Sequence, residues 1–472
     1  MKREIGRERT LHIYDTLQRT LAPVLASDGK TFRIYCCGPT VYRDAHVGNL
    51  RTFLLSDLVQ RTLEFGGGNV RLIQNITDVG HMSEDFEEDK ILAQSKVENR
   101  DPFAVARDYE AKFHADLSAM NVTPAAAYPR ASECIAMMIE HISHLIDMGF
   151  AYVGEDSSVY FAAEKFESYG ELSGNRLAAL KPGHRYEYSE DGAKRFHADW
   201  ALWKAAGNRS EMIWNTPWGL GFPGWHIECS AMSLHYLQGH VDLHIGGIDL
   251  RFPHHENERA QSNPLVQGEA VSLWLHGEHL LFEGRKMSKS AGNVVLLSDV
   301  IARGIDPLAV RFCFLENRYR SQMDLSWQSI NAAFSLLQRW REKYQSWRSE
   351  GAELTPHAKE SIASMYGDFC NDLDTPRALI KLRALERDES YFPSEKAAIF
   401  ESVDRLFGVD LLAIRPLREL SLHARELLQQ RDSARRAKDF ASSDQIRDQL
   451  LQLGIEVRDT VNGQSWNWVS TQ

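Results

Sequence analysis

TFRIYCC, residues 31–37, is an apolar run that ends at Gly38, and VRLIQNI, residues 70–76, is a second such run. The first carries β-branched and aromatic residues and the second β-branched ones, as is typical of buried strands. Between them, residues 49–65 place apolar side chains at helical spacing, and Gly66 to Gly68 would end that helix. Strand, helix and strand in this order predict a parallel βαβ unit and therefore an α/β fold.

Length and composition limit the classes of protein to which the chain can belong. At 472 residues it should form about three domains, and its 43% hydrophobic and 25% charged residues are typical of globular proteins. The charged start MKREIGRERT lacks a signal peptide's apolar stretch, and no run reaches the length of a membrane helix. We therefore expect a cytoplasmic protein without membrane contact.

Charge and cysteine content narrow the range of partners. The net charge of −11 argues against indiscriminate binding of nucleic acid, so we expect no DNA partner and only local contact with any RNA. Six cysteines are scattered through the chain, unlike the dense disulfide framework of a small secreted domain. Reduced thiols or metal ligands are the expected roles.

The rest of the chain divides by pattern. Residues 115–215 mix a predicted helix, Ser132 to Met148, with a polar loop segment, 181–193, and look inserted into the first domain. Residues 219–292 are dense in glycine, histidine and aromatic residues, like the second half of a nucleotide-binding sheet. From Ser329 the pattern is helical. The predicted fold is a Rossmann-like doubly wound parallel sheet with an insertion, followed by an α-helical bundle and a small terminal region.

Two motifs suit a nucleotide. His46-Val47-Gly48-Asn49 lies where a strand-derived loop meets a helix start, a place that favours phosphate, although a histidine that merely caps the helix explains it as well. Lys286 to Ser290, KMSKS, puts two ammonium groups and two hydroxyls on one loop, which could equally be a solvated basic turn. The presence of both motifs, each beside strand-like segments, favours the nucleotide interpretation.

A third group of residues offers metal ligands. In FPHHENE, residues 252–258, His254 and Glu258 lie at i and i+4 and share one helix face. Cys229 in GWHIECSAM and Cys37 at the end of the first strand could join them where strand ends converge. Because no CxxC pair is present, spacing alone leaves an alternative open. Both cysteines could be small buried residues, and HHENE could be a charge cluster at a helix start.

The motifs together resemble those of class I aminoacyl-tRNA synthetases, with HVGN in place of HIGH and with an unaltered KMSKS. The strings CGxTVY, GWHIECSAM and DLxFPHHENE resemble the cysteinyl-tRNA synthetases in particular, over essentially the whole chain. This resemblance implies one Zn²⁺ per chain, ATP as substrate with Mg²⁺, and formation of a cysteinyl-adenylate. The implied metal ligands are Cys37, Cys229, His254 and Glu258, and the implied catalytic residues are His46, Lys286 and Lys289.

The resemblance also implies which residues line the adenylate and cysteine site. These residues are Gly38, Thr40, His46, Asn49, Thr52, Asn75, Thr77, Trp225, His244, Gly247, Asp249 and Lys289. Asn49 replaces the last histidine of HIGH, so a cationic role there is excluded. The segment after Thr77 departs from the NITDIDDK of many relatives, and no role is assigned beyond Asp78.

The resemblance implies the following domains: the first half of a Rossmann catalytic domain (1–115), a connective insertion (116–215), the second half with the KMSKS loop (216–292), a stem-contact linker (293–328), a helical bundle (329–415) and an anticodon-binding region (416–472). The implied partners are tRNA(Cys), L-cysteine and ATP, with the chain acting as a monomer.

The terminal region carries basic residues on predicted helix, before Trp466 and Trp468. They are Arg425, Arg431, Arg435, Arg436, Lys438 and Arg447. They could read RNA together with aromatic residues, or form a solvated, ion-paired face.

The chemistry explains why such an enzyme would use zinc. An apolar pocket separates near-isosteres such as cysteine and serine poorly, whereas Zn²⁺ prefers thiolate sulfur. Two rival functions share part of this pattern. A ligase that joins cysteine to glucosaminyl-inositol in mycothiol synthesis would lack the terminal region, and a catalytically inactive RNA-binding paralogue would be expected to have lost KMSKS or a zinc ligand. The region, the motif and the ligands are all present.

Overall fold

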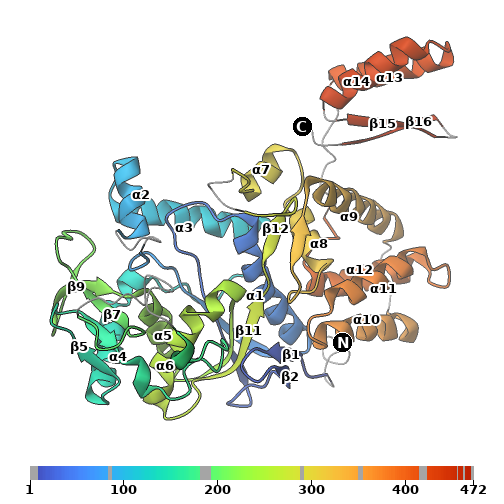
Figure 1. Ribbon diagram of the computed structural model, residues 1–472. Coiled ribbons are helices and arrows are strands. Elements are labelled where there is room, and N and C mark those ends of the chain that lie inside the picture. The colour runs from blue at the N-terminus through green and yellow to red at the C-terminus, as the bar shows by residue number, and fades with distance from the viewer. Residues whose placement is uncertain are drawn as a thin grey trace.

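The computed structural model describes residues 9–82, 88–180, 193–287, 292–348, 354–413, 422–453, 455–460 and 463–468. A parallel sheet with the strand order β11-β10-β3-β4 lies at its centre (Figure 1). The strands are β3 (Thr31–Cys36), β4 (Asn69–Gln74), β10 (Val241–Gly247) and β11 (Val271–Gly277). In β3, Tyr35 lies opposite His244 of β10 on one side and opposite Ile73 of β4 on the other.

The predicted βαβ unit is confirmed, with small shifts at its ends. Helix α1 (Val47–Phe65) connects the parallel strands β3 and β4. It begins two residues before the predicted Asn49, because His46 caps it and exchanges hydrogen bonds with Asn49. Helix α1 is buried along its whole length, since it packs against β10 and β4 of the sheet and against helices α8 and α12 of the later part of the chain.

The chain between β4 and β10 forms a second layer of structure. Its helices are α2 (Lys90–Glu98), α3 (Pro102–Ala119), α4 (Ile135–Asp147) and α5 (Trp225–Tyr236). Its antiparallel sheet has the order β5-β6-β7-β9-β8, with β5 (Ala151–Val153), β6 (Val159–Phe161), β7 (Trp200–Ala205), β8 (Trp214–Thr216) and β9 (Gly219–Pro223). The predicted helix at Ser132 starts later, at Ile135, after a 3₁₀ turn at Ala131–Glu133. Helix α6 (His254–Val266) connects β10 to β11 and packs on α5.

Helices dominate the remainder of the chain, as predicted. A small sheet has the strand order β13-β12-β14. Strands β12 (Leu280–Phe282) and β13 (Arg285–Lys286) come before helices α7 (Leu297–Ala302) and α8 (Leu308–Leu315) in the chain, and β14 (Met323–Leu325) follows them. The bundle consists of α9 (Trp327–Trp347), α10 (Pro356–Cys370), α11 (Thr375–Arg387) and α12 (Pro393–Phe407), and Figure 1 places it beside α1. Near the N-terminus, β1 (His12–Asp15) and β2 (Thr20–Pro23) pair with each other in an antiparallel hairpin. None of the described helices is both long and apolar enough to cross a membrane.

The C-terminal segment has a core of its own. Helices α13 (Leu422–Arg436) and α14 (Phe440–Gln452) pack on the hairpin of β15 (Ile455–Thr460) and β16 (Gly463–Trp468). Leu427, Leu450 and Ile455 are buried in a cluster separate from the main core. In Figure 1 this unit stands apart from the central sheet. The prediction that Lys438 lies on a helix is wrong, because it sits between α13 and α14 with a positive φ of 60°.

Candidate functional site: a pocket above a buried ligand cluster

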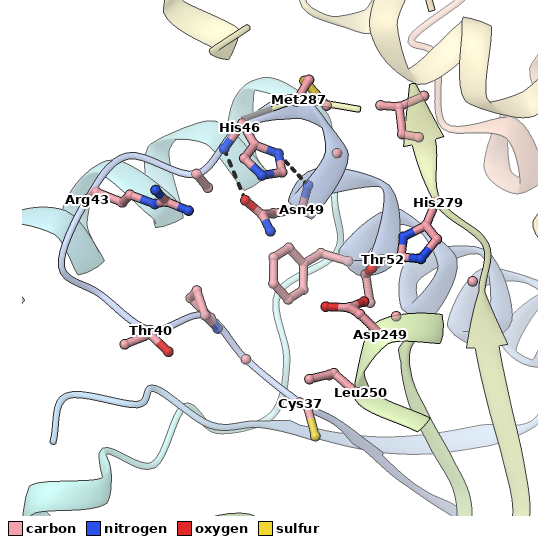
Figure 2. A pocket seen from close by; sticks show the side chains of 18 of the residues that line it. Cys37, Thr40, Arg43, His46, Asn49, Thr52, Asp249, Leu250, His279 and Met287 are labelled. Carbon is pink, nitrogen blue, oxygen red and sulfur yellow. Dashed lines mark hydrogen bonds between the residues drawn. The ribbon is translucent and has the colours of Figure 1, made fainter. Parts of the chain in front are cut away.

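A cavity of about 360 Å³ opens at the carboxyl ends of β3, β10 and β11 (Figure 2). In open parallel sheets this edge is where ligands bind, because the loops that follow the strands converge there. Most of the predicted substrate-binding residues line it. They are Gly38, Thr40, His46, Asn49, Thr52, Trp225, Gly247 and Asp249, and the predicted metal ligand Cys37 and catalytic residue Lys286 line it as well.

The HVGN motif forms the start of α1 at the wall of this cavity. The Nδ1 atom of His46 accepts the backbone N–H of Asn49 at 3.2 Å, and the Asn49 carbonyl oxygen accepts the N–H of His46 at 3.2 Å. The interpretation of His46 as a helix cap is therefore correct. Because Nδ1 accepts, the ring proton lies on Nε2, and neither this N–H nor the Asn49 NH₂ group is used in the cap.

The electrostatics of His46 favour a neutral ring. Burial, and then the neighbouring Arg43, lower the pKa of His46 from 6.5 to about 4. The two side chains of the motif that face the cavity are thus neutral hydrogen-bond donors. Gly48 lets the KMSKS segment come close, since a Cβ there would lie 2.8 Å from the Cε atom of Met287.

The described part of the KMSKS segment, Lys286 and Met287, reaches the cavity beside HVGN. Lys286, at the end of β13, lines the cavity together with the buried Met287. The side chain of Asn293 donates to the backbone oxygen of Lys286 at 3.0 Å. Lys289 lies outside the described residues, so its predicted role stays a prediction.

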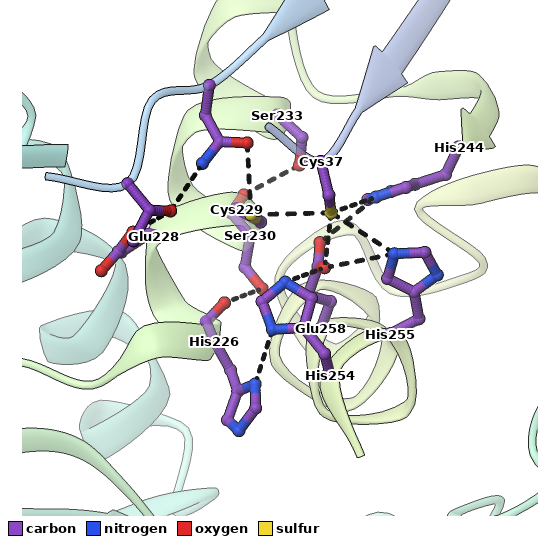
Figure 3. A network of polar contacts seen from close by, with 12 residues as sticks. Cys37, His226, Glu228, Cys229, Ser230, Ser233, His244, His254, His255 and Glu258 are labelled. Atoms are coloured by element: carbon purple, nitrogen blue, oxygen red, sulfur yellow. Dashed lines mark hydrogen bonds and ion pairs between the residues drawn. The ribbon is translucent and has the colours of Figure 1, made fainter. Parts of the chain in front are cut away.

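The predicted metal ligands meet in one buried network (Figure 3), and one of them, Cys37, lines the cavity. Cys37 follows β3, Cys229 lies in α5, and His254 and Glu258 lie one turn apart in the first part of α6. All four are at most 4% exposed, and their ligand atoms lie within 4.8 Å of one another. We refer to these four residues as the Cys37 cluster.

The spacing inside the Cys37 cluster fits a tetrahedral ion. The two Sγ atoms are 3.8 Å apart, Cys37 Sγ is 3.5 Å from Glu258 Oε1, and His254 Nε2 is 3.0 Å from the same oxygen. Two Zn–S bonds of about 2.3 Å in a tetrahedron would separate the sulfurs by about 3.8 Å. The donor set of two thiols, an imidazole and a carboxyl also suits zinc.

A second set of ligand atoms overlaps the first. Cys37 and Glu258 also lie within 4.8 Å of His244 and His255, and both ring Nε2 atoms are 3.3 Å from Cys37 Sγ. Only the first set contains both cysteines, which a borderline-soft cation prefers. The structure therefore shows a buried group that could hold a metal, and sulfur content favours the first set.

Burial makes Cys37 and Glu258 costly to ionise without a cation, whereas at Cys229 the hydrogen bond from Cys37 and the neighbouring His254 outweigh burial and lower the pKa. The pKa values of Cys37 and Glu258 are both raised well above their ordinary values, and desolvation is the main cause for each. Every ion pair of Glu258 within the described residues is with a histidine. A bound divalent cation would reverse this balance and favour the thiolate and carboxylate forms.

Three predicted substrate-binding residues do not line the cavity. Asn75 and Thr77 lie beneath it: Asn75 Oδ1 accepts the N–H of Gly38 at 2.7 Å, and its amide donates to the Thr77 hydroxyl at 3.0 Å. Thr77 in turn donates to Glu228 at 3.0 Å. His244 is buried beside Cys37. These three residues shape the floor of the cavity and lie below its surface.

Sequence reasoning missed several residues of the wall. Arg43, His81 and Lys90 all line the cavity. For His81 and Lys90 the one sequence signal was the departure of the segment after Asp78 from the pattern of many relatives, and Arg43 had none. That departure marked the segment as unusual without indicating a role.

The basic residues of the C-terminal segment are largely paired. Arg431 is 1% exposed and bonds to Asp459 and Gln464 of the hairpin at 2.9–3.1 Å, so a solvated position for it is wrong. Arg436 pairs with Asp432 at i and i+4, as expected for a solvated face. The structure places Trp466 half-buried against the small terminal core.

Comparison with known proteins defines first the class and then the family. Residues 23–335 match the family model described as tRNA synthetases class I (C) catalytic domain, and residues 417–466 match the Cysteinyl-tRNA ligase anticodon binding domain. The chain is 40% identical to the cysteine–tRNA ligase of Thermus thermophilus over 97% of its own length and 99% of that protein. It is 39% identical to cysteine–tRNA ligase 1 of Burkholderia lata over 96% of each chain. The chain belongs to the cysteine–tRNA ligase family.

Solved structures agree on the fold. The chain resembles the Mycobacterium tuberculosis methionyl-tRNA synthetase in complex with methionyl-adenylate with a TM-score of 0.52, covering 80% of this chain and 89% of that one. At 13% identity this likeness supports only the fold. It agrees with the predicted Rossmann-like sheet and helical C-terminal half.

Proposed function

We propose that this chain ligates L-cysteine to tRNA(Cys) at the expense of ATP, by way of a cysteinyl-adenylate. One observation carries the proposal: the buried Cys37 cluster adjoins, through Cys37, the floor of a cavity whose walls carry His46 and Lys286. An amino acid whose sulfur reached the floor would hold its carboxylate farther up, toward the nucleotide motifs.

The Cys37 cluster supplies selectivity. A zinc ion held by Cys37, Cys229, His254 and Glu258 could take the substrate sulfur as an additional, thiolate ligand by expanding its coordination, and a serine hydroxyl would replace that ligand poorly. The side chain of Trp225 supports this floor, because its ring lies 4.2 Å from the ring of His254. We therefore assign the metal to recognition of the amino acid and not to the acyl chemistry.

The walls of the cavity serve the transfer of the adenylyl group. When the cysteine carboxylate attacks the α-phosphate, negative charge grows on phosphate oxygens and on the leaving pyrophosphate, which Mg²⁺ would accompany. The Nε2–H of His46 and the Asn49 amide can donate to these oxygens, and Lys286 and Lys289 supply positive charge. The remaining wall residues, Gly38, Thr40, Thr52, Gly247 and Asp249, hold the adenylate, with Asn75, Thr77 and His244 supporting them from below.

The later part of the chain is proposed to hold the tRNA. We assign residues 116–215 to the acceptor end, residues 293–328 to the stem, and residues 416–472 to the anticodon, and we expect a monomer that works in the cytoplasm. The match of residues 417–466 to an anticodon-binding model supports a tRNA over a small amino sugar as the acceptor.

Charging of a tRNA(Cys) transcript with labelled cysteine tests this function. We expect ATP-dependent charging that is lost after zinc is stripped with a chelator and restored by added zinc. Serine should not be charged. Cysteine-dependent ATP–pyrophosphate exchange followed by transfer to glucosaminyl-inositol, and not to tRNA, would contradict the proposed acceptor, while absence of any exchange would contradict the enzyme activity itself.

A further inference from the structure

His81 forms part of the cavity wall. Its ring stacks on that of Trp225, with the ring centres 4.0 Å apart and the planes at 10°. Trp225 also contacts His254 of the Cys37 cluster. His81 therefore lies between the floor of the cavity and the outer wall formed by Arg43 and Lys90.

Both ring nitrogens of His81 have polar neighbours at hydrogen-bond distance. Lys90 Nζ is 2.6 Å from Nε2, and the hydroxyl oxygen of Thr40 is 2.5 Å from Nδ1. An ammonium group can only donate, so Nε2 must accept from Lys90. The ring proton is then on Nδ1, which donates to Thr40. Burial, and then the charge of Lys90, lower the pKa of His81 well below 6.5, in keeping with a neutral ring.

The backbone fixes Lys90 and His81 relative to one another. The N–H of Lys90 donates to the carbonyl oxygen of His81 at 3.0 Å, and Met82 pairs with Asp89 in an antiparallel bridge. Asp89 also caps α2 by accepting the N–H of Ile91 at 2.9 Å. The hydrogen bond between the two side chains is thus held by the backbone pairing of residues 81–82 with residues 89–90 and by the start of α2.

The consequence concerns the hydroxyl proton of Thr40. Its oxygen accepts from His81, and this is the one hydrogen bond that the hydroxyl makes with the described part of the chain. Thr40 lines the cavity, so its proton remains for a group bound there. If His81 carried its proton on Nε2, Thr40 would donate to Nδ1 and offer the cavity only lone pairs.

We propose that Lys90 and His81 are positioning residues that make Thr40 an obligate hydrogen-bond donor to an anionic oxygen of the substrate, on the cysteine carboxylate or on the α-phosphate. This inference rests on the proposed function, because that function places a carboxylate and a phosphate in this cavity. It assigns the Lys90–His81–Thr40 chain to orientation of the reacting groups.

The first test reads the tautomer directly in the ligand-free protein. A nitrogen-15 spectrum of the histidine rings, with His81 identified by its loss in His81→Phe, should show the proton on Nδ1. Lys90→Met should shift the population toward Nε2–H, whereas Lys90→Gln, whose amide can still donate, should shift it less. A proton on Nε2 in the unaltered protein would overturn the inference, whatever the enzyme's activity.

The second test uses ATP–pyrophosphate exchange in the full chain. Thr40→Val should lower kcat/KM for cysteine by roughly 10- to 100-fold, the value of a hydrogen bond to a charged group. A rise confined to the cysteine KM would assign the carboxylate as acceptor, and a fall in kcat would assign the α-phosphate. His81→Phe keeps the stack but loses both hydrogen bonds, and it should match Thr40→Val, with no further loss in the double variant.

Two comparisons separate positioning from stability. His81→Asn, whose amide can donate in place of Nδ1–H, should recover part of the rate lost in His81→Phe. His357 stacks on Tyr391 in the bundle with ring centres 4.1 Å apart and planes at 12°, so His357→Phe is a matched control that should leave exchange unchanged. Additive losses in the Thr40 and His81 double variant, or a full rate in Thr40→Val, would refute the inference. Absence of exchange in the unaltered chain would instead contradict the proposed function.

Discussion

The Cys37 cluster and the surroundings of Arg311 are both buried, and both join segments that are distant in sequence, but they balance charge differently. Arg311 in α8 is fully buried and donates from Nε to the carbonyl oxygen of Phe407 at 2.7 Å. Its other nitrogens bond to backbone oxygens at the end of α3 and pair with Asp57 of α1 at 2.6 Å. Asp57 also pairs with Arg61 at 2.8 Å.

The Cys37 cluster has no such counter-charge among the described residues. Its thiols and its carboxyl lie beside one another and beside histidines. Burying a charge is costly unless an opposite charge is paired with it. The Arg311 site holds both charges and can serve the structure alone, whereas the acidic groups of the Cys37 cluster lack a cation and are suited to bind one. This contrast distinguishes a structural element from a ligand site, even though both are equally buried.

The largest expected effect is the loss of the Arg311 guanidinium. Arg311→Met should lower the free energy of unfolding by about 3 kcal/mol, because it leaves the buried Asp57 carboxylate with Arg61 as its remaining charged partner. Chemical denaturation measures this, and the exchange rate at low temperature should change little. The double variant Arg311→Met, Asp57→Leu should be more stable than the single one. If the single and the double variant were equally stable, the unpaired Asp57 carboxylate would not be the cause of the lost stability.

Breaking the Cys37 cluster should damage function more than folding. Cys229→Ser should raise the cysteine KM roughly 100-fold, equivalent to about 2.7 kcal/mol, and abolish bound zinc in metal analysis. Discrimination against serine should weaken as well. Cys313→Ser is the matched control, because Cys313 and Cys229 are each 1% exposed and Cys313 lies in α8 outside the cluster. Normal cysteine kinetics without zinc would contradict the assignment.

Acid should weaken the Arg311 site in a defined pH range. Burial raises the pKa of Asp57, but Arg311 and Arg61 more than offset this and hold that pKa below its ordinary value. The stabilisation from Asp57 is therefore complete above the unfolded pKa of about 3.9 and is lost as the pH falls toward the folded pKa. Denaturation of the unaltered chain and of Asp57→Asn should give a stability gap that narrows below pH 4 by up to about 1.4 kcal/mol per pH unit. A constant gap would contradict the shift.

The smallest effect is expected where charges are solvated. Arg436 pairs with Asp432 on α13, and its side chain is 81% exposed. Arg436→Met should change the free energy of unfolding by less than about 0.5 kcal/mol, because water screens such a pair. A larger loss of stability in thermal or chemical denaturation would mean that the exposure of an ion pair does not predict its contribution to the free energy of unfolding.

Local pattern determined several features of this protein. Helical and strand periodicity predicted the β3-α1-β4 unit, and the i and i+4 spacing of His254 and Glu258 predicted that they share a helix face. The position of HVGN at a helix start was also readable, because capping depends on residues three apart. In each case the interacting atoms belong to neighbouring residues, so short-range geometry suffices.

Tertiary structure decided the rest. Cys37 and Cys229 meet across 192 residues because β3 lies beside β10 in the sheet order, which periodicity does not encode. The resemblance named these ligands, but only packing shows that His244 and His255 surround them, that Asn75 and Thr77 lie beneath the cavity, and that Arg431 turns inward. The His81 ring between Lys90 and Thr40 belongs to the same group, since Thr40 and His81 meet across 41 residues and periodicity does not encode that contact.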